Sequence, residues 1–445
     1  MNRLLSFFDQ ETKRLAKNSS WVFLSNFYST GLAFVRSVLI ARGLGATLFG
    51  SYTLVVAFVG LVQEFLNLNL GTALIKFGAG YHTGNRNDKL FALVKVSMRV
   101  SGVMALLSVV VITLLTLFSD AELHRMQGMD AYVIAYAVAA SITYFNSISR
   151  GMLRLYYRFR ISSLIEMIMD TVETVVVGIV VFFFPKNIAV FFPAIIAVRF
   201  INAFICNFIA FLELKSEWKH YYNVDTEVLA DDRRDIRGFV VGNSLGNTLK
   251  TVISQGDVLL LGILTSPEQV AYYAIAKKLA YAILTLTDPL ASSIYPQLAK
   301  LLADRKFSEV TTMLGKITRF TVLPALGFFV IMYFLHRWMI VFLYGHEFSA
   351  AAASFMYFLA GALLGAVTFW TLPLVQSLGL VRMRIVAYLT TIIVGISLSW
   401  LLIPHFAAAG MAMALLITNV LNATIFIFFS FRSINLVSRS ESTAL

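Results

Sequence analysis

Long apolar runs alternate with short polar intervals along the whole chain. A helix needs about 20 predominantly apolar residues to cross the hydrocarbon core of a bilayer, and these runs have about that length. The pattern therefore predicts an all-α polytopic membrane protein with about twelve transmembrane helices. The predicted spans cover residues 18–41, 51–71, 91–118, 131–149, 161–184, 188–212, 238–264, 270–295, 317–335, 350–372, 384–403 and 409–431. A tight Ala-Arg-Gly-Leu-Gly turn at 41–45 separates the first two.

Positive charge is distributed unequally between the two sides of this predicted bundle. About 24 Lys and Arg residues lie in the intervals on the side of the N-terminus, and about 4 lie on the opposite side. The positive-inside rule then predicts that both termini are cytoplasmic. It also accounts for the net charge of +12 without nucleic acid as a partner. Residues 1–17 are polar and basic and lack the apolar region of a signal peptide.

Composition supports the membrane class and argues against an enzyme. The chain of 445 residues is 58% hydrophobic and only 13% charged, whereas soluble domains are about 25% charged. The single cysteine, Cys206, excludes a disulfide framework or a thiolate metal cluster. The sequence contains no HExxH pair, no GxSxG serine and no GxxxxGK(S/T) phosphate loop. Neither an enzyme nor a metal site is expected.

The two halves of the chain share a register. Tyr52 at the start of the second span corresponds to Tyr273 at the start of the eighth, an offset of 221 residues, and the same offset places Arg36 on Asp257. With six helices in each half, the halves have the same orientation, so their pseudo-twofold axis is expected to run along the membrane normal. The predicted lobes are residues 1–225 and 226–445.

Polar side chains form a stripe on the seventh predicted span and a weaker one on the first. Their spacing in alternating steps of three and four residues places each set on one helical face. Lipid cannot satisfy such a face, so it must meet water or protein. The two stripes either line a common central cavity or form a dry seam between the lobes. They comprise Asn243, Asn247, Lys250, Ser254 and Asp257, and Asn26, Ser29, Ala33 and Arg36.

Arg36 and Asp257 are charged residues at equivalent depths of the two halves. Each lies about 27–28 Å from the cytoplasmic start of its span, at 1.5 Å per residue, and so near the outer face. They could form an ion pair that closes the outer mouth. Alternatively, Arg36 binds an anionic substrate and Asp257 binds a proton or Na+. The two interpretations are compatible, because a gate pair that breaks on substrate arrival is a switch.

Carboxylates cluster on the fifth span, where Glu166, Asp170 and Glu173 share one face, and Arg199 of the sixth span lies at a similar depth. One interpretation is a buried ion pair that holds neighbouring helices together. The other is a cation or proton site, since clustered carboxylates disfavour each other's ionised forms. Two further acids, Glu64 and Asp288, lie toward the cytoplasmic end and could form an inner vestibule or gate.

Several stretches are similar to one known family of membrane proteins. They are LAKNSSWVFLSNF at 15–27, LIARGLGATLFGSYTL at 39–54, LNLGTALIKFGA at 68–79, GDVLLLGILTSPEQVAYYAIAKKL at 256–279, IYPQLAKL at 294–301 and LYGHEF at 343–348. These segments resemble the polysaccharide-repeat flippases. These flippases form the Wzx-like branch of the multidrug/oligosaccharidyl-lipid/polysaccharide (MOP) exporter superfamily.

The resemblance implies a MATE-like fold, with two six-helix lobes in a V around a cationic central cavity, that works by alternating access. The implied cargo is a polyprenyl-pyrophosphate-linked oligosaccharide, passed from the cytoplasmic to the outer leaflet of the bacterial inner membrane. It would serve O-antigen, capsule or exopolysaccharide assembly. Membrane lipid, the polysaccharide polymerase and chain-length proteins are the other candidate partners. No cofactor is expected beyond a coupling H+ or Na+.

The resemblance also directs the choice of site residues. Arg36 occupies the place where related lipid-linked-precursor flippases carry a cavity arginine, and the planar guanidinium group suits pyrophosphate because it can bond two oxygens at once. Lys250 lies on the polar stripe at about mid-depth. The expected substrate residues are Arg36, Lys250, Arg42, Arg199, Asn26 and Asn247. The coupling-ion or gate candidates are Asp257, Glu166, Asp170, Glu173, Glu64 and Asp288.

The main alternative function is a cation-coupled multidrug exporter of the MATE type. Such exporters take lipophilic cations, which favour an acidic cavity, and the basic residues here argue against one. The lipid II flippases are a third relative, but they usually have about fourteen spans. A polymerase, ligase or polytopic glycosyltransferase is least expected, because the outer intervals are short and hold little catalytic material.

Overall fold

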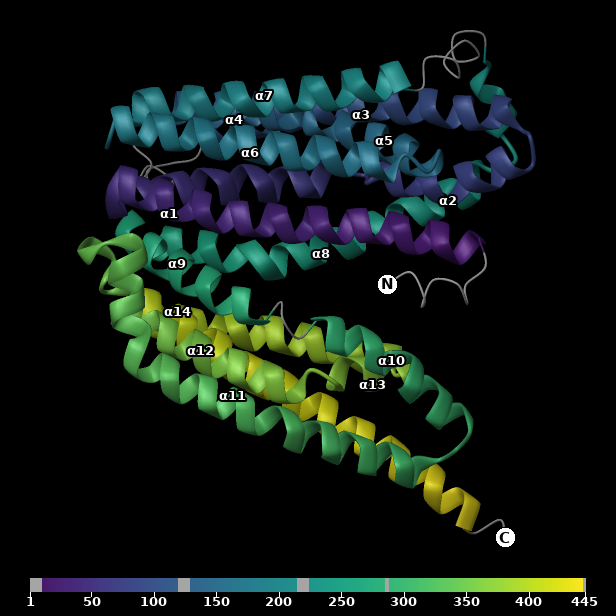
Figure 1. Ribbon diagram of the computed structural model, residues 1–445, viewed down its shortest axis with the longest axis vertical. Coiled ribbons are helices and arrows are strands. Elements are labelled where there is room, and N and C mark those ends of the chain that lie inside the picture. Colours follow the sequence, from purple (N-terminus) through teal and green to yellow (C-terminus); the bar gives the residue numbers. More distant parts are fainter. Residues whose placement is uncertain (1–9, 119–128, 214–223, 285–287, 443–445) are drawn as a thin grey trace. The chain divides into compact units, whose positions relative to one another are not determined.

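The computed structural model describes residues 10–118, 129–213, 224–284 and 288–442. The regular elements within these ranges are helices (Figure 1). The chain divides into two compact units. The first contains Met1–Leu48 and Val55–Gly256, and the second contains Phe49–Leu54 and Asp257–Leu445. The division therefore falls inside two helices, on both sides of Phe49–Leu54 and between Gly256 and Asp257, and the predicted lobes stay a prediction.

The first unit is a bundle of long helices with short connections, several of which run alongside one another (Figure 1). Its elements are α1 (Gln10–Leu66) apart from Phe49–Leu54, α2 (Leu70–Thr83), α3 (Asn87–Phe118), α4 (Asp130–Ser141), α5 (Thr143–Leu155), α6 (Phe159–Phe183), α7 (Ile188–Glu213), η4 (Thr226–Leu229) and the first part of α8 (Arg233–Leu264).

Helix α1 contains the turn predicted at 41–45. Gly45 has φ 76° and ψ 175°, which is not helical, so two helices meet there at a kink. Only glycine adopts such a positive φ readily. Gly43, two residues earlier, packs so closely on α6 that an added Cβ would lie 2.2 Å from Val181, and its carbonyl accepts a hydrogen bond from the backbone N–H of Lys186. The turn prediction is confirmed.

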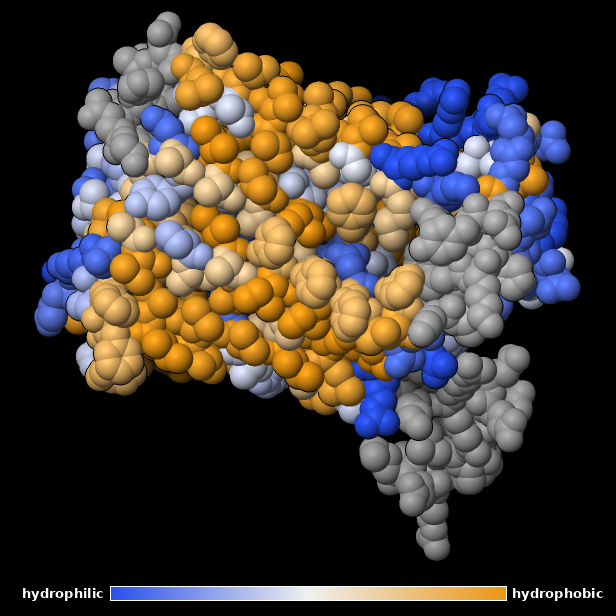
Figure 2. Space-filling model, turned by 90° about the horizontal axis from the view of Figure 1, so that it is seen from above, coloured by the Kyte–Doolittle hydropathy of each residue, from blue (hydrophilic) through white to orange (hydrophobic). Residues whose placement is uncertain are grey.

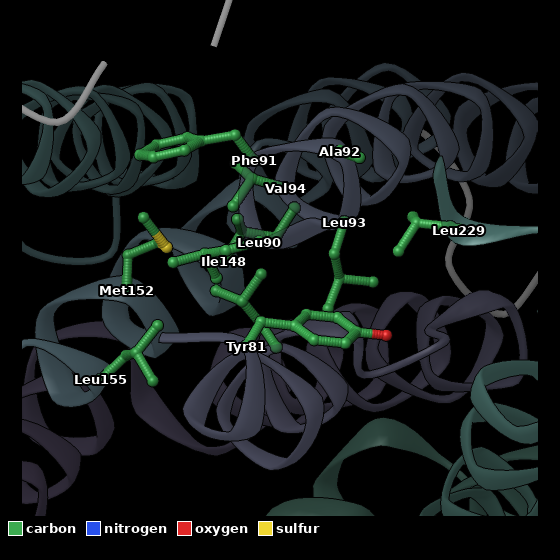
Figure 3. Packing of buried hydrophobic residues seen from close by; sticks show 11 residues of the cluster. Tyr81, Leu90, Phe91, Ala92, Leu93, Val94, Ile148, Met152, Leu155 and Leu229 are labelled. Atoms are coloured by element: carbon green, nitrogen blue, oxygen red, sulfur yellow. The ribbon is translucent and has the colours of Figure 1, made fainter. Parts of the chain in front are cut away.

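A hydrophobic core joins α2, α3 and α5, with Tyr81, Phe91, Ile148 and Met152 among its buried members (Figure 3). Helices α2 and α5 approach closely because Gly71 lacks a side chain. A Cβ at this position would lie 2.1 Å from the carbonyl oxygen of Ser147.

The polar interval before α8 is attached to this core. Leu229 of η4 is buried in the cluster (Figure 3). Asp232 accepts hydrogen bonds from Lys89 at 2.9 Å and from Tyr81 at 2.7 Å. The Lys89 bond, followed by the Tyr81 bond, lowers the pKa of the Asp232 carboxyl below its usual value. The end of this interval therefore belongs to the first unit.

The second unit contains the end of α8, α9 (Pro267–Leu284), α10 (Asp288–Ala303), α11 (Phe307–Tyr344), η5 (His346–Phe348), α12 (Ala351–Thr368), α13 (Thr371–Ser377) and α14 (Val381–Ser442). Helix α14 is interrupted at Ala407, which has φ 47° and ψ −124°. This kink lies between the predicted spans 384–403 and 409–431. An added Cβ at Gly410 would lie 2.3 Å from the carbonyl oxygen of Leu402, so the two segments pack tightly.

Large apolar side chains cover the outer faces of the helices. Leu106 of α3 is 69% exposed, Phe204 of α7 61% and Phe320 of α11 79%. On the face shown in Figure 2, hydrophobic residues cover the middle and hydrophilic residues gather at two opposite ends. Exposed apolar side chains on so many helices are unusual for a soluble monomer and fit contact with lipid.

Seven helical stretches among the described residues are long and apolar enough to cross a membrane. Two of them, Ser20–Thr83 with 64 residues and Arg382–Ile434 with 53, contain the kinks described above. At 1.5 Å per residue each is about 80 Å long or more, which exceeds twice the hydrocarbon thickness of about 30 Å. The protein is therefore a multi-pass membrane protein, and the full set of about twelve spans stays a prediction.

Candidate functional site

Arg36 points from α1 toward α6 and meets two carboxylates there. Its Nη1 atom lies 3.2 Å from Glu173 Oε2 and 3.6 Å from Asp170 Oδ1. The side chain of Glu173 is only 8% exposed and that of Arg36 only 16%. Asp170 and Glu173 are three residues apart, so one helical face presents both acids to the same guanidinium group.

Arg199 of α7 completes this cluster. Its Nε atom lies 3.8 Å from Glu173 Oε1, so Glu173 contacts one arginine with each of its carboxylate oxygens. The Arg199 guanidinium group also lies over the ring of Tyr136 of α4, 4.9 Å from the ring centroid. We call Arg36, Asp170, Glu173 and Arg199 the four-charge cluster.

The four-charge cluster contains two cationic and two anionic groups, so its formal charge is balanced. A buried charge without a partner is far more costly than a buried pair, and the cluster avoids that cost by pairing each arginine with carboxylate. The sequence predicted Arg36 and Arg199 as substrate residues and Asp170 and Glu173 as coupling-ion or gate candidates. The structure brings all four into contact. An anion that binds Arg36 has to compete with Asp170 and Glu173 for the guanidinium group.

Polar contacts continue along the same helices away from the four-charge cluster. The Tyr28 hydroxyl of α1 shares a hydrogen bond of 2.8 Å with Thr171 of α6. About one turn further, Glu166 contacts Ser25 Oγ at 3.3 Å and Arg150 Nη1 of α5 at 3.4 Å. All three predicted acids of α6 are therefore held by groups on neighbouring helices of the same unit.

Asp257 is the centre of a second buried cluster, in the second unit. Its side chain is 4% exposed, and its Oδ2 atom lies 2.5 Å from Lys277 Nζ of α9. The Tyr273 hydroxyl donates a hydrogen bond to the same oxygen. Because Arg36 and Asp257 each have partners in their own unit, the outer gate pair considered from the sequence stays a prediction.

Glu64 lies at the end of α1, in the turn that leads into α2. Its carboxylate accepts hydrogen bonds from Asn67 at 3.5 Å and Asn69 at 3.4 Å, and Asn69 has a left-handed φ of 47°. The Thr248 hydroxyl of α8 donates to the Glu64 carbonyl at 3.2 Å. These contacts stabilise the turn and attach α8 to it, so Glu64 has a structural role that the sequence did not predict.

The remaining predicted site residues are distributed more widely. Asn26 and Arg42 are exposed, and Asn247 is half-buried on α8. Asn243, on the same polar stripe, donates a hydrogen bond of 2.9 Å to Thr72 of α2. Lys250 and Ser254 belong to α8 and Asp288 begins α10, but their side chains are not among those that the structure describes.

Sequence reasoning missed Lys277 as a site residue and counted Arg150 only among the positive charges on the cytoplasmic side. A signal for Lys277 was present, because it lies inside the predicted span 270–295, where the cost of burying a charge marks a residue for attention. The same argument identified Arg36. Tyr273 carried no such signal, because only the fold brings its hydroxyl to Asp257.

Two hollows of the first unit are apolar. One of about 630 Å³ lies between α4 and α7 and is lined by residues such as Tyr132, Pro193 and Phe200. Another of about 330 Å³ is lined by Met98, Phe145, Asn207 and neighbouring apolar residues. Neither includes a member of the four-charge cluster.

Comparison with known proteins gives the family and the fold. Residues 15–302 match the model of a family described as polysaccharide biosynthesis protein. No curated protein sequence matches. Among solved structures, an inward-facing MATE family transporter of the MOP superfamily has a TM-score of 0.69 at 14% identity, covering 92% of this chain and 96% of that one.

Two further structures have the same architecture. The lipid II flippase MurJ in an inward closed conformation has a TM-score of 0.67 at 14% identity, covering 92% of this chain and 88% of its own. The Vibrio cholerae MATE transporter VcmN has a TM-score of 0.58 at 12% identity, covering 96% and 98%. The fold is thus that of MATE and MurJ transporters. Since the family match covers more than half of the chain's residues, the chain belongs to the polysaccharide biosynthesis protein family.

Proposed function

We propose that the protein is a flippase for a polyprenyl-pyrophosphate-linked oligosaccharide. It would move this lipid from the cytoplasmic to the outer leaflet of a bacterial inner membrane during assembly of a surface polysaccharide. The observation that carries the proposal is the family match over residues 15–302, on a chain whose fold is similar to that of a lipid II flippase. Both termini would be cytoplasmic, as the positive-inside rule predicts.

The proposed contact with the pyrophosphate group is made by Arg36, assisted by Arg199. In the structure these guanidinium groups contact Asp170 and Glu173, which are internal anions. A pyrophosphate would replace the carboxylates at Arg36. A carboxylate left without its cation in a low-dielectric site is costly, so its release would be matched by uptake of a proton or Na+. The four-charge cluster would in this way link anion binding to a coupling ion.

The alternative is a cation-coupled multidrug exporter of the MATE type, which has the same fold. The family match favours the flippase, because it concerns polysaccharide biosynthesis. Arg36 and Arg199 of the four-charge cluster could bind an anionic cargo, provided that it displaces Asp170 and Glu173.

The test is delivery of surface glycan in cells that depend on this protein. Arg36→Ala should reduce delivery about 10- to 100-fold, because a charge-assisted hydrogen bond contributes about 1.5–3 kcal/mol. Arg36→Lys, which keeps the charge but loses the planar fork, should give an intermediate value. Arg337→Ala is the control, since Arg337 is exposed in the second unit. Full delivery by Arg36→Ala at normal protein level would refute the assignment.

A further inference from the structure

The pair formed by Asp257 and Lys277 differs from an ion-binding site in one respect: its cation is part of the chain. We propose that Lys277 is a built-in counter-cation for Asp257 and occupies the place that an exchangeable H+ or Na+ would take. With Lys277 present, this carboxylate binds no free cation, so any coupling ion acts elsewhere. The inference bears on the coupling of the proposed transport, but its test needs no substrate.

The buried carboxylate of Asp257 needs a cation beside it. The Asp257 side chain is 4% exposed, in the apolar segment Gln255–Leu264. An ionised carboxylate removed from water needs an opposite charge nearby. Intramembrane ionisable residues accordingly pair with one another or bind the ions that a transporter carries.

Both oxygens of the Asp257 carboxylate already have partners in the chain. Oδ2 receives both the Lys277 ammonium, at 2.5 Å, and the Tyr273 hydroxyl. Oδ1 accepts the backbone N–H of Val258 at 2.8 Å. A free cation would have to displace the ammonium group from Oδ2.

Lys277 is held near Asp257 by its place on α9 between two tyrosines. Tyr273, Lys277 and Tyr281 are spaced four residues apart, so they share one face of α9. The ammonium nitrogen lies 5.8 Å from the Tyr273 ring centroid and 5.9 Å from that of Tyr281. A group tethered so close to its partner has an effective concentration of millimolar or more, and a dissolved ion competes poorly with it.

The titratable or charged groups that face Asp257 in the described contacts all come from α9. They are Tyr273, Lys277 and, by a longer-range interaction, Tyr281. From α12, the ring of Phe358 lies 5.2 Å from that of Tyr273. Among the side chains that the structure describes, removing the Lys277 charge leaves Asp257 with a hydroxyl, a backbone N–H and no cation, and the site should then accept a proton or Na+ from solution.

The experiment measures the unfolding temperature of the purified full-length protein in detergent. NaCl is compared with choline chloride at equal ionic strength, and the pH is lowered from about 8 to about 6. In the wild type, Asp257 should contribute no rise in unfolding temperature, either when Na+ replaces choline or when the pH falls. Lys277→Met should gain a rise of about 3 °C or more with Na+ or with falling pH, as expected for a ligand that binds only the folded state.

Three variants serve as controls. Lys278→Met removes the adjacent lysine and should behave as the wild type. Lys277→Arg keeps a tethered cation and should also show no gain. The double variant Asp257→Asn/Lys277→Met lacks the carboxylate, so the gain should disappear.

Two results would overturn the proposal. One is a Na+- or H+-dependent stabilisation of the wild type that Asp257→Asn abolishes, which can be measured even if Lys277→Met does not fold. The other is a Lys277→Met variant whose response to both ions matches that of Lys278→Met. Failure of glycan delivery assays would bear on the flippase proposal alone, because the ion responses are measured without substrate.

Discussion

At the residue scale, three acids of the described helices are paired with arginines or lysines of the same unit, and two of them, Glu173 and Asp257, are buried. Glu173 contacts Arg36 and Arg199, Glu166 contacts Arg150, and Asp257 contacts Lys277. Forming such a pair adds little net stability, because both ions lose their hydration. Removing one member is costly, because the other is left buried and charged. The pairs therefore restrict which single substitutions the fold tolerates.

Glu173→Gln should destabilise the first unit strongly. It removes the Glu173 carboxylate from both Arg36 and Arg199, and losing one member of a buried pair costs about 3–5 kcal/mol. The measurement is the unfolding temperature in detergent.

The matched variant is Glu173→Gln/Arg199→Met, which removes one charge of each sign. It should recover part of the stability lost by Glu173→Gln, because contacting residues are not additive. If the stability lost by the double variant equals the sum of the losses of Glu173→Gln and Arg199→Met, the contact between Glu173 and Arg199 contributes no energy of its own.

At the element scale, close helix contacts depend on glycines whose role is visible only in the packed structure. Gly71 of α2 faces the Ser147 carbonyl of α5, whereas Gly80 of the same helix has nothing within 4 Å of the position of a Cβ. The two glycines have the same chemistry and differ in surroundings. Glycine in a helix is less favourable than alanine by about 1 kcal/mol, so it needs a packing reason to be useful.

Gly71→Ala and Gly80→Ala should therefore have opposite effects. Alanine at 71 would place its Cβ 2.1 Å from a backbone oxygen, so α2 and α5 would have to separate, and we expect a loss of about 1–3 kcal/mol. Alanine at 80 meets open space and should be neutral or stabilising by about 1 kcal/mol or less. Unfolding temperatures of the two variants check this pair, and a tolerated Gly71→Ala would show that the helix contact is looser than the structure has it.

At the scale of the whole molecule, the distribution of Lys and Arg predicts how the chain is inserted in the membrane. The positive-inside rule depends on loop charge during insertion and not on packing. It predicts that the interval containing Asp231 is cytoplasmic and that the loop containing Glu347 is on the outer side. Both residues are exposed, and the only native cysteine, Cys206, is buried.

Single cysteines at these two positions should distinguish the sides. In intact cells with a permeable outer membrane, a membrane-impermeant thiol reagent should label Glu347→Cys and should label Asp231→Cys only after the inner membrane is opened. The protein without an introduced cysteine should stay unlabelled, because Cys206 is buried. The reverse pattern would place both termini outside the cytoplasm.

Sequence alone determined the features that follow from short-range chemistry. Apolar run length identifies an all-α membrane protein, and the glycine-rich segment at 41–45 identifies the turn confirmed at Gly45. The cost of a charge in a bilayer picks out Arg36, Asp170, Glu173 and Arg199 as notable, and the structure brings these four into one cluster. Family-like motifs predicted the polysaccharide biosynthesis family, which the match over residues 15–302 confirms.

Tertiary structure alone decided which charge meets which. The sequence related Asp257 only to the equivalent position in the other half, and the structure pairs it with Lys277 and Tyr273. The sequence placed Glu64, an acid, near the cytoplasmic end, and the structure shows that it stabilises a turn. The structure also placed the end of the polar interval before α8 on the core of the first unit. Helical periodicity shows which face of a helix a residue occupies, but the neighbour on that face comes from chain segments tens or hundreds of residues away. Only packing brings those segments together.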